Sequence, residues 1–88
     1  WKAQQLLSEQ WINASLRSSA ANQDYGFLWW LNHNGHLGKH SPSVYAAEGF
    51  GGNFIVVDSE NDLVVVTRWL EPSKIGNLVE LIANAIRR

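Results

Sequence analysis

The residues best suited to chemistry lie in one stretch, 45–66, which reads YAAEGFGGNFIVVDSENDLVVV. In it, Gly49, Gly51 and Gly52 come just before a run of phenylalanine, isoleucine and valine. Glycine weakens a strand because it loses the most conformational freedom on folding and offers no side chain for packing. The cluster therefore predicts either a β-bulge at the start of a strand or a backbone amide within hydrogen-bonding distance of a substrate.

The order of the elements argues against a phosphate-binding role for these glycines. Phosphate loops run from a strand through glycines into a helix, because the helix N-terminus faces the anion. Here the glycines run into residues 53–58, NFIVVD, which predict a strand. We therefore do not expect a phosphate site.

Three histidines, His33, His36 and His40, have a spacing that would place them on one face of a helix, as a zinc site could require. The asparagine and glycines between them predict a loop instead. Besides Glu48 and Asp24, the sequence offers no evident fourth ligand. We expect solvated loop histidines, and neither a metal nor another cofactor.

Aromatic and acidic side chains give two weaker candidates. Tyr25, Trp29 and Trp30 could line a ligand pocket, but adjacent strand residues point to opposite faces, so at most one of the tryptophans can face a given cleft. Core packing is the favoured interpretation. Glu48 and Glu9 could act as a general acid and base, yet nothing in the sequence brings them together.

The sequence lacks the residues that covalent catalysis needs. It contains neither a Gly-x-Ser-x-Gly elbow nor a Ser-x-x-Lys pair. It also contains no cysteine, which excludes disulfides, thiolate metal sites and a cysteine nucleophile. Taken alone, the chain is predicted to be inactive as a covalent catalyst.

Size and composition indicate a chain that needs further protein around it. Of its 88 residues, 45% are hydrophobic and five are tryptophan, which is much apolar surface for so small an interior. The net charge of −1 comes from scattered charges, so we expect no nucleic-acid partner. No apolar run approaches the ~20 residues of a membrane span. With no methionine, even at position 1, the sequence reads as part of a longer polypeptide.

Periodicity predicts an α+β fold in one domain, 1–88, with an antiparallel sheet covered by an N-terminal and a C-terminal helix. Ser8 is predicted to cap a new helical turn within the first helix. The polar SEND between two β-branched runs predicts a hairpin, and spacings of three and four from Ile75 onward predict an amphipathic helix, with Arg87 and Arg88 at its negative end. The predicted elements are helix 2–16, loop 17–24, strand 25–31, surface loop 32–43, strands 53–58 and 63–69, and a helix after Pro72.

The succession YGFLWW, YAAEGFGGNFIVVDSENDLVVV and an amphipathic terminal helix resembles the C-terminal portion of the β-lactamase-related serine hydrolases. This group includes class C β-lactamases, penicillin-binding DD-peptidases, esterases and 6-aminohexanoate-dimer hydrolases. The resemblance is closest to the last two, and it implies a partial β-lactamase or transpeptidase-like fold. It also implies that the catalytic serine, lysine and tyrosine lie in a missing N-terminal part.

The resemblance places Ala47, Glu48 and Gly49 at the position of the family's Lys-Thr-Gly motif, beside the substrate. It makes the backbone N–H of Phe50 one of two oxyanion-hole donors, while the remaining glycines, Gly51 and Gly52, let the strand edge lie against the acyl group. Such a donor contributes about 3 kcal/mol to transition-state stabilisation. Ala47 departs from the family's lysine, which implies weaker recognition of penicillins and D-alanyl peptides.

The resemblance thus implies a C-terminal fragment of a serine hydrolase that acts on a small ester or non-peptide amide through an acyl-enzyme. Its partner would be the missing N-terminal part of the same protein. The alternative is a non-catalytic α+β binding or association module, which the apolar composition would also suit.

Overall fold

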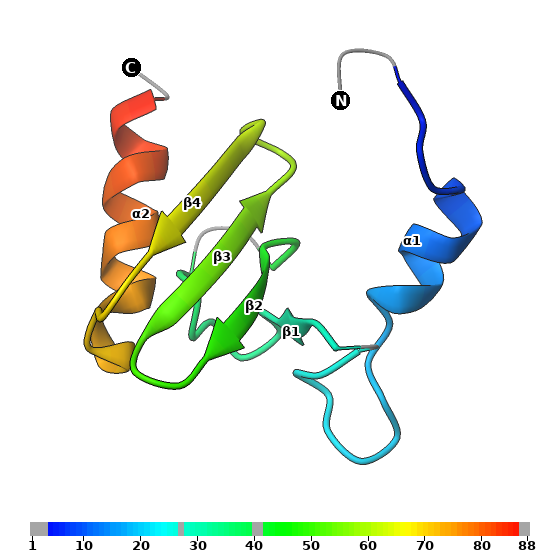
Figure 1. Ribbon diagram of the computed structural model, residues 1–88, viewed down its shortest axis with the longest axis horizontal. Coiled ribbons are helices and arrows are strands. Elements are labelled where there is room, and N and C mark those ends of the chain that lie inside the picture. The colour runs from blue at the N-terminus through cyan, green and yellow to red at the C-terminus, as the bar shows by residue number, and fades with distance from the viewer. Residues whose placement is uncertain (1–3, 27, 40–41, 87–88) are drawn as a thin grey trace.

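A four-stranded antiparallel sheet forms the middle of the molecule, as a computed structural model of residues 4–26, 28–39 and 42–86 shows (Figure 1). The strands follow one another across the sheet in chain order. The α+β class with an antiparallel sheet and two helices is confirmed. The elements are α1 (Glu9–Ser15), β1 (Trp30–Leu31), β2 (Tyr45–Gly49), β3 (Asn53–Asp58), β4 (Leu63–Thr67), a 3₁₀ turn η1 (Pro72–Lys74) and α2 (Ile75–Ile86).

The predicted hairpin is confirmed as β3 and β4, which pair antiparallel from Phe54 with Thr67 to Asp58 with Leu63. The buried carboxylate of Asp58 shapes the turn, because it accepts hydrogen bonds from the backbone N–H of Asn61 at 3.3 Å and from its side-chain amide at 2.7 Å. β4 ends before the predicted residue 69, where Trp69 takes a left-handed φ of 58° that an extended strand does not allow.

The core lies between the sheet and α2, as the amphipathic spacing predicts. Ile75 and Val79 of α2 are buried against Phe54 and Val56 of β3 and against Ala46 of β2. Full burial of an aliphatic side chain of this size stabilises the fold by about 1.5–3 kcal/mol. Arg87 and Arg88, predicted to follow this helix, lie outside the described residues.

The prediction that 32–43 is a surface loop is wrong in one respect, since Leu37 is fully buried in the core. The buried amide of Asn32 fixes the loop, donating to the Gly38 carbonyl at 2.7 Å and accepting from the Leu37 N–H at 2.8 Å. Gly76 of α2 lets the loop approach, because a side chain there would lie 2.9 Å from the His36 carbonyl oxygen.

The predicted strand 25–31 is also wrong for most of its length, since only Trp30 and Leu31 form β1. Leu28 takes a left-handed φ of 71°, and the N–H of Gly26 donates to the carbonyl of Trp29 at 2.8 Å. The chain therefore turns back on itself, which brings Tyr25 into an antiparallel bridge with Trp30.

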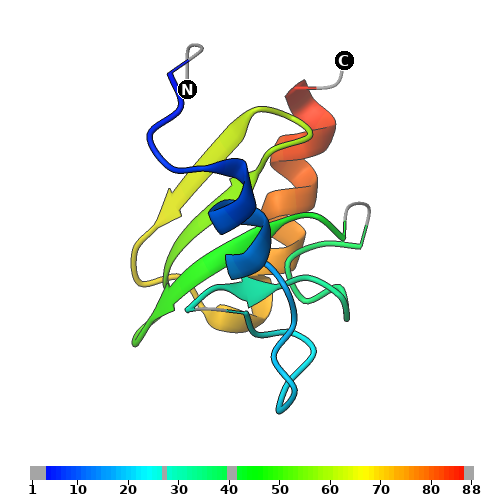
Figure 2. The same cartoon turned by 90° about the vertical axis from the view of Figure 1, so that its right-hand side faces the viewer.

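The first helix is shorter than the predicted 2–16. Residues 4–8 are not helical, and residues 1–3 lie outside the described part of the chain. The predicted cap is confirmed, because the Ser8 hydroxyl accepts a hydrogen bond from the Trp11 N–H at 3.1 Å at the start of α1. Figures 1 and 2 show α1 on the side of the sheet opposite α2.

The face of the sheet turned away from α2 is apolar and only partly covered. By register, its residues are Tyr45, Ala47, Ile55, Val57, Val64 and Val66, which we call the open face. α1 lies near Tyr45 and Ala47, while Ile55 is 47% exposed and Val66 is 66% exposed. The predicted cover by two helices therefore holds fully for one face and only in part for the other.

Neither helix in the described part of the chain is long and apolar enough to cross a membrane.

Candidate functional site

Half of strand β2 has an open edge. β1 pairs only with Tyr45 and Ala46, so the stretch from Ala47 to Gly49 has β3 on one side and no described strand on the other. The backbone of these residues is therefore accessible from the side. This is the stretch that the resemblance to serine hydrolases would place beside a substrate.

The glycine cluster lies in the turn between β2 and β3, and we call Gly49–Asn53 the glycine turn. Phe50 opens the turn with a side chain that is 97% exposed. Its N–H donates to no acceptor within the described residues, whereas its carbonyl accepts from the Asn53 side chain at 2.8 Å. The amide is thus outside the β2–β3 ladder and available to an external acceptor.

Two of the glycines are explained by packing within the fold. Gly51 and Gly52 have φ values of 86° and 79°, which non-glycine residues rarely adopt. A Cβ on Gly51 would lie 2.5 Å from the ring of Trp69, and one on Gly52 would overlap the carbonyl of Leu70. These positions need glycine whether or not a substrate binds nearby.

Gly49 differs from the other two because the fold does not require it. A Cβ there would meet only Asn53, at an ordinary 3.6 Å. Its backbone is not in the left-handed region, so an alanine would fit without strain. Because Gly49 lies two residues after Ala47 in β2, it is on the open face, and the absence of a side chain leaves that face bare next to Phe50.

The glycine turn is tied firmly to the chain that leaves β4. The Asn53 side chain accepts from the Trp69 N–H at 3.3 Å in addition to its bond with Phe50. The Gly52 carbonyl accepts from the Leu70 N–H and from the Thr67 hydroxyl, both at 3.2 Å. The left-handed backbone of Trp69 is held in place by these contacts.

A shallow depression of about 390 Å³ lies beside the glycine turn. Ala47, Gly49 and Asn53 line it from one side, and Ile55, Val66 and Arg68 contribute from the hairpin. Arg68 makes no ion pair within the described residues. Sequence reasoning missed Asn53 and Arg68, and the one local signal was a charged residue two positions after the valine run.

Glu48 is turned to the other side of the sheet. Its register with Phe54 places it on the α2 side, where its carboxylate lies 3.6 Å from the imidazole Nε2 of His36. Glu9 begins α1, on the opposite side of the sheet. The structure therefore does not bring these two carboxylates together as an acid–base pair.

The histidines do not assemble a metal site in what the structure describes. His40 lies outside the described residues. Among the rest, no three histidine, cysteine, aspartate or glutamate side chains come together in a way that could hold an ion.

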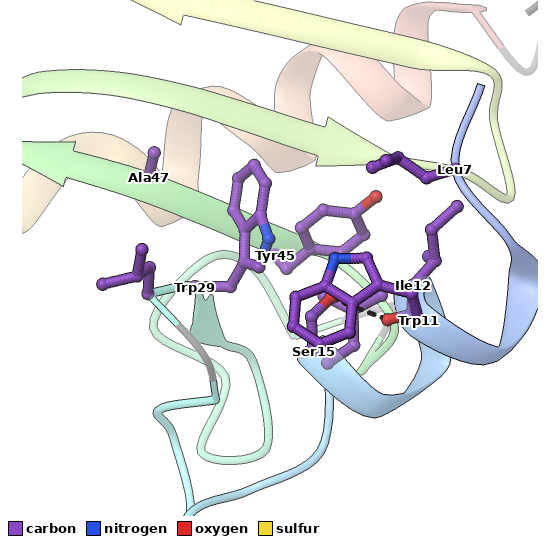
Figure 3. A pocket seen from close by; sticks show the side chains of 9 residues that line it. Leu7, Trp11, Ile12, Ser15, Trp29, Tyr45 and Ala47 are labelled. Carbon is purple, nitrogen blue, oxygen red and sulfur yellow. Dashed lines mark hydrogen bonds between the residues drawn. The ribbon is translucent and has the colours of Figure 1, made fainter.

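A second hollow, the aromatic cavity, lies between α1 and β2 and has a volume of about 470 Å³ (Figure 3). Trp29 packs edge-on against Tyr45 at a ring distance of 5.0 Å, and Trp11 faces them from α1. Trp30 instead packs on Tyr25, whereas Trp29 lines this cavity. Burial raises the pKa of the Tyr45 hydroxyl.

The aromatic cavity and the depression share a wall, because Ala47 lines both. The remaining lining of the cavity carries no ionisable acid or base apart from the tyrosine hydroxyl. It comprises Leu7, Trp11, Ile12, Ser15, Leu16, Leu28, Trp29 and Tyr45. A ligand that reached from one hollow to the other would pass Ala47 of β2.

Compared with known proteins, the chain matches no family profile, no curated protein and no solved structure.

Proposed function

We propose that this chain is the C-terminal portion of a serine hydrolase that cleaves a small ester or amide through an acyl-enzyme. In this proposal the chain supplies the strand beside the substrate and the Phe50 N–H as one oxyanion-hole donor. The serine and its base come from another part of the polypeptide, because these 88 residues contain no Ser-x-x-Lys pair.

The observation that carries the proposal is the N–H of Phe50, which has no acceptor among the described residues and lies at the end of an open strand edge. A preorganised backbone donor is what an oxyanion requires, since it stabilises the developing charge without reorganising. The Asn53 side chain donates to Phe50 and accepts from Trp69, and the Gly52 carbonyl accepts from Leu70; these hydrogen bonds keep the glycine turn fixed. Gly49 leaves room for an acyl group next to that donor.

The aromatic cavity supports an ester or amide with an apolar group. Its lining is mostly hydrocarbon and aromatic ring, and it adjoins the strand edge through Ala47. An apolar acyl or alcohol group in this cavity would be desolvated, which favours binding by about 25 cal/mol for each Å² of apolar surface removed from water.

The test is to replace Phe50 by proline in the complete polypeptide that the proposal requires. Proline lacks the N–H, and loss of one oxyanion donor lowers kcat by about 10²–10³-fold. Hydrolysis of p-nitrophenyl butyrate measures the effect. Phe50→Ala is the matched control, because it keeps the N–H and removes a side chain that is 97% exposed.

If the proline and alanine variants have the same turnover, the Phe50 N–H is not an oxyanion-hole donor. Circular dichroism and a thermal melt of both variants separate loss of the donor from loss of the fold.

The open face favours a second candidate function, a non-catalytic association module. Ile55, Val64 and Val66 expose apolar side chains on one continuous face of the sheet. Contiguous apolar patches on soluble proteins mark interaction surfaces. The two functions are distinguished by the effect of Phe50→Pro, which should leave association unchanged.

A further inference from the structure

We propose that Arg68 binds a carboxylate of the substrate in the depression beside the glycine turn. The substrate is then an ester or amide that carries a free carboxylate. The identity of the ligand as a substrate rests on the proposed function, whereas binding of a carboxylate by Arg68 can be tested without it.

Arg68 has the charge and freedom to bind an anion. Of the residues that line the depression, Arg68 is the one cation. Its guanidinium forms no ion pair with a carboxylate in residues 4–26, 28–39 and 42–86. The acid in the same lining, Glu48, has its carboxylate 3.6 Å from His36 on the α2 side of the sheet. Arg68 is therefore not neutralised by its neighbours.

The backbone on both sides of Arg68 is anchored to the glycine turn. Thr67 before it donates to the Gly52 carbonyl at 3.2 Å, and Trp69 after it donates to the Asn53 side chain at 3.3 Å. The same Asn53 side chain donates to the Phe50 carbonyl. The attachment point of the guanidinium is thus fixed relative to the Phe50 amide, as a group that positions a substrate requires.

The surroundings of Arg68 favour a planar anion. Ala47, Ile55 and Val66 give the lining apolar side chains, against which the hydrocarbon part of a ligand can pack. Guanidinium and carboxylate match as two parallel N–H···O bonds.

Paired esters test the proposal in the complete polypeptide. Mono-p-nitrophenyl glutarate carries a carboxylate on its acyl chain, and p-nitrophenyl butyrate is its neutral counterpart. We expect Arg68→Gln to lower kcat/KM for the glutarate ester by about 10- to 100-fold, the range for a lost charged hydrogen bond. The butyrate ester should be unaffected, and Arg68→Lys should lie between. Equal losses for both esters, or no loss, would overturn the proposal.

A binding measurement separates this proposal from the proposed hydrolase. If the polypeptide cleaves neither ester, the hydrolase assignment fails, and monomethyl glutarate is then titrated into it by calorimetry. Saturable binding that weakens with added salt and is lost in Arg68→Gln supports the carboxylate site. No binding to the wild type, or equal binding to both proteins, overturns it.

Discussion

At the scale of single residues, Tyr45 illustrates how burial changes a side chain's acid–base chemistry. Its hydroxyl lies at the aromatic cavity, where Trp29 packs against the ring. Loss of water raises the pKa of Tyr45 because the phenolate is less well solvated there than in the unfolded chain. The neutral form is thus favoured in the folded state.

This shift predicts a pH dependence of stability in the alkaline range. The unfolded tyrosine loses its proton near a pH of about 10, while the folded one retains it to higher pH. The stabilisation from Tyr45 is therefore complete below that pH and is lost as pH rises through the folded pKa. Urea unfolding at a series of pH values should show a shallower decline for Tyr45→Phe than for the wild type; identical curves would contradict this.

At the scale of elements, the glycine turn joins β2 to β3 and holds the chain leaving β4. Packing determines Gly51 and Gly52, whose positive φ values and close neighbours admit no side chain. Gly49 is the one residue of the three that the fold leaves free. A functional reason for glycine is therefore needed at that position alone.

Alanine substitutions at two glycines test this distinction. Gly52→Ala should destabilise the fold by more than about 2 kcal/mol, from its left-handed backbone and the overlap with Leu70. Gly49→Ala should change the free energy of unfolding by less than about 1 kcal/mol while impairing ester hydrolysis. Chemical denaturation measures the change in the free energy of unfolding for both variants. Equal destabilisation by both substitutions would show that Gly49 is also structural.

Local patterns predicted the elements whose signals are contained in their own residues. The β-branched runs around SEND gave β3 and β4, and the spacing from Ile75 gave α2. The stretch 25–31 is apolar throughout, so it offered no periodicity to reveal the left-handed turn at Leu28. Tertiary contacts decided its course.

Within the candidate site, features set by neighbouring residues could be predicted from the sequence, whereas contacts between residues distant in sequence could not. The glycines marked the turn, but the role of Asn53 depends on Trp69, sixteen residues later. That contact follows from the register of β3 with β4, which places the end of one strand beside the start of the other. Arg68 enters the site for the same reason.

At the scale of the whole molecule, one face of the sheet is covered and the other is largely exposed. α2 and the buried Leu37 complete the core on one face. On the open face, α1 reaches only the neighbourhood of Tyr45 and Ala47. The edge strand β4 adds exposed Val64 and Val66 to this surface.

We expect the 88-residue chain to self-associate through the open face, since burying apolar surface drives association. Val64→Lys places a charge on this face and should shift the chain toward monomer in sedimentation velocity. Leu81→Lys is the control, because Leu81 is exposed on α2 and should leave association unchanged. A wild type that is monomeric at all concentrations, or equal behaviour of the two variants, would contradict the prediction.

The 36–38 loop packs closely against Gly76 of α2, and this contact has a consequence for how the two move. A Cβ on Gly76 would lie only 2.9 Å from the His36 carbonyl oxygen, so the loop is packed closely on the helix backbone. Leu37 anchors the same loop in the core. We therefore expect a tilt of α2 to shift the 36–38 loop and to change the distance between His36 and Glu48, which is 3.6 Å here.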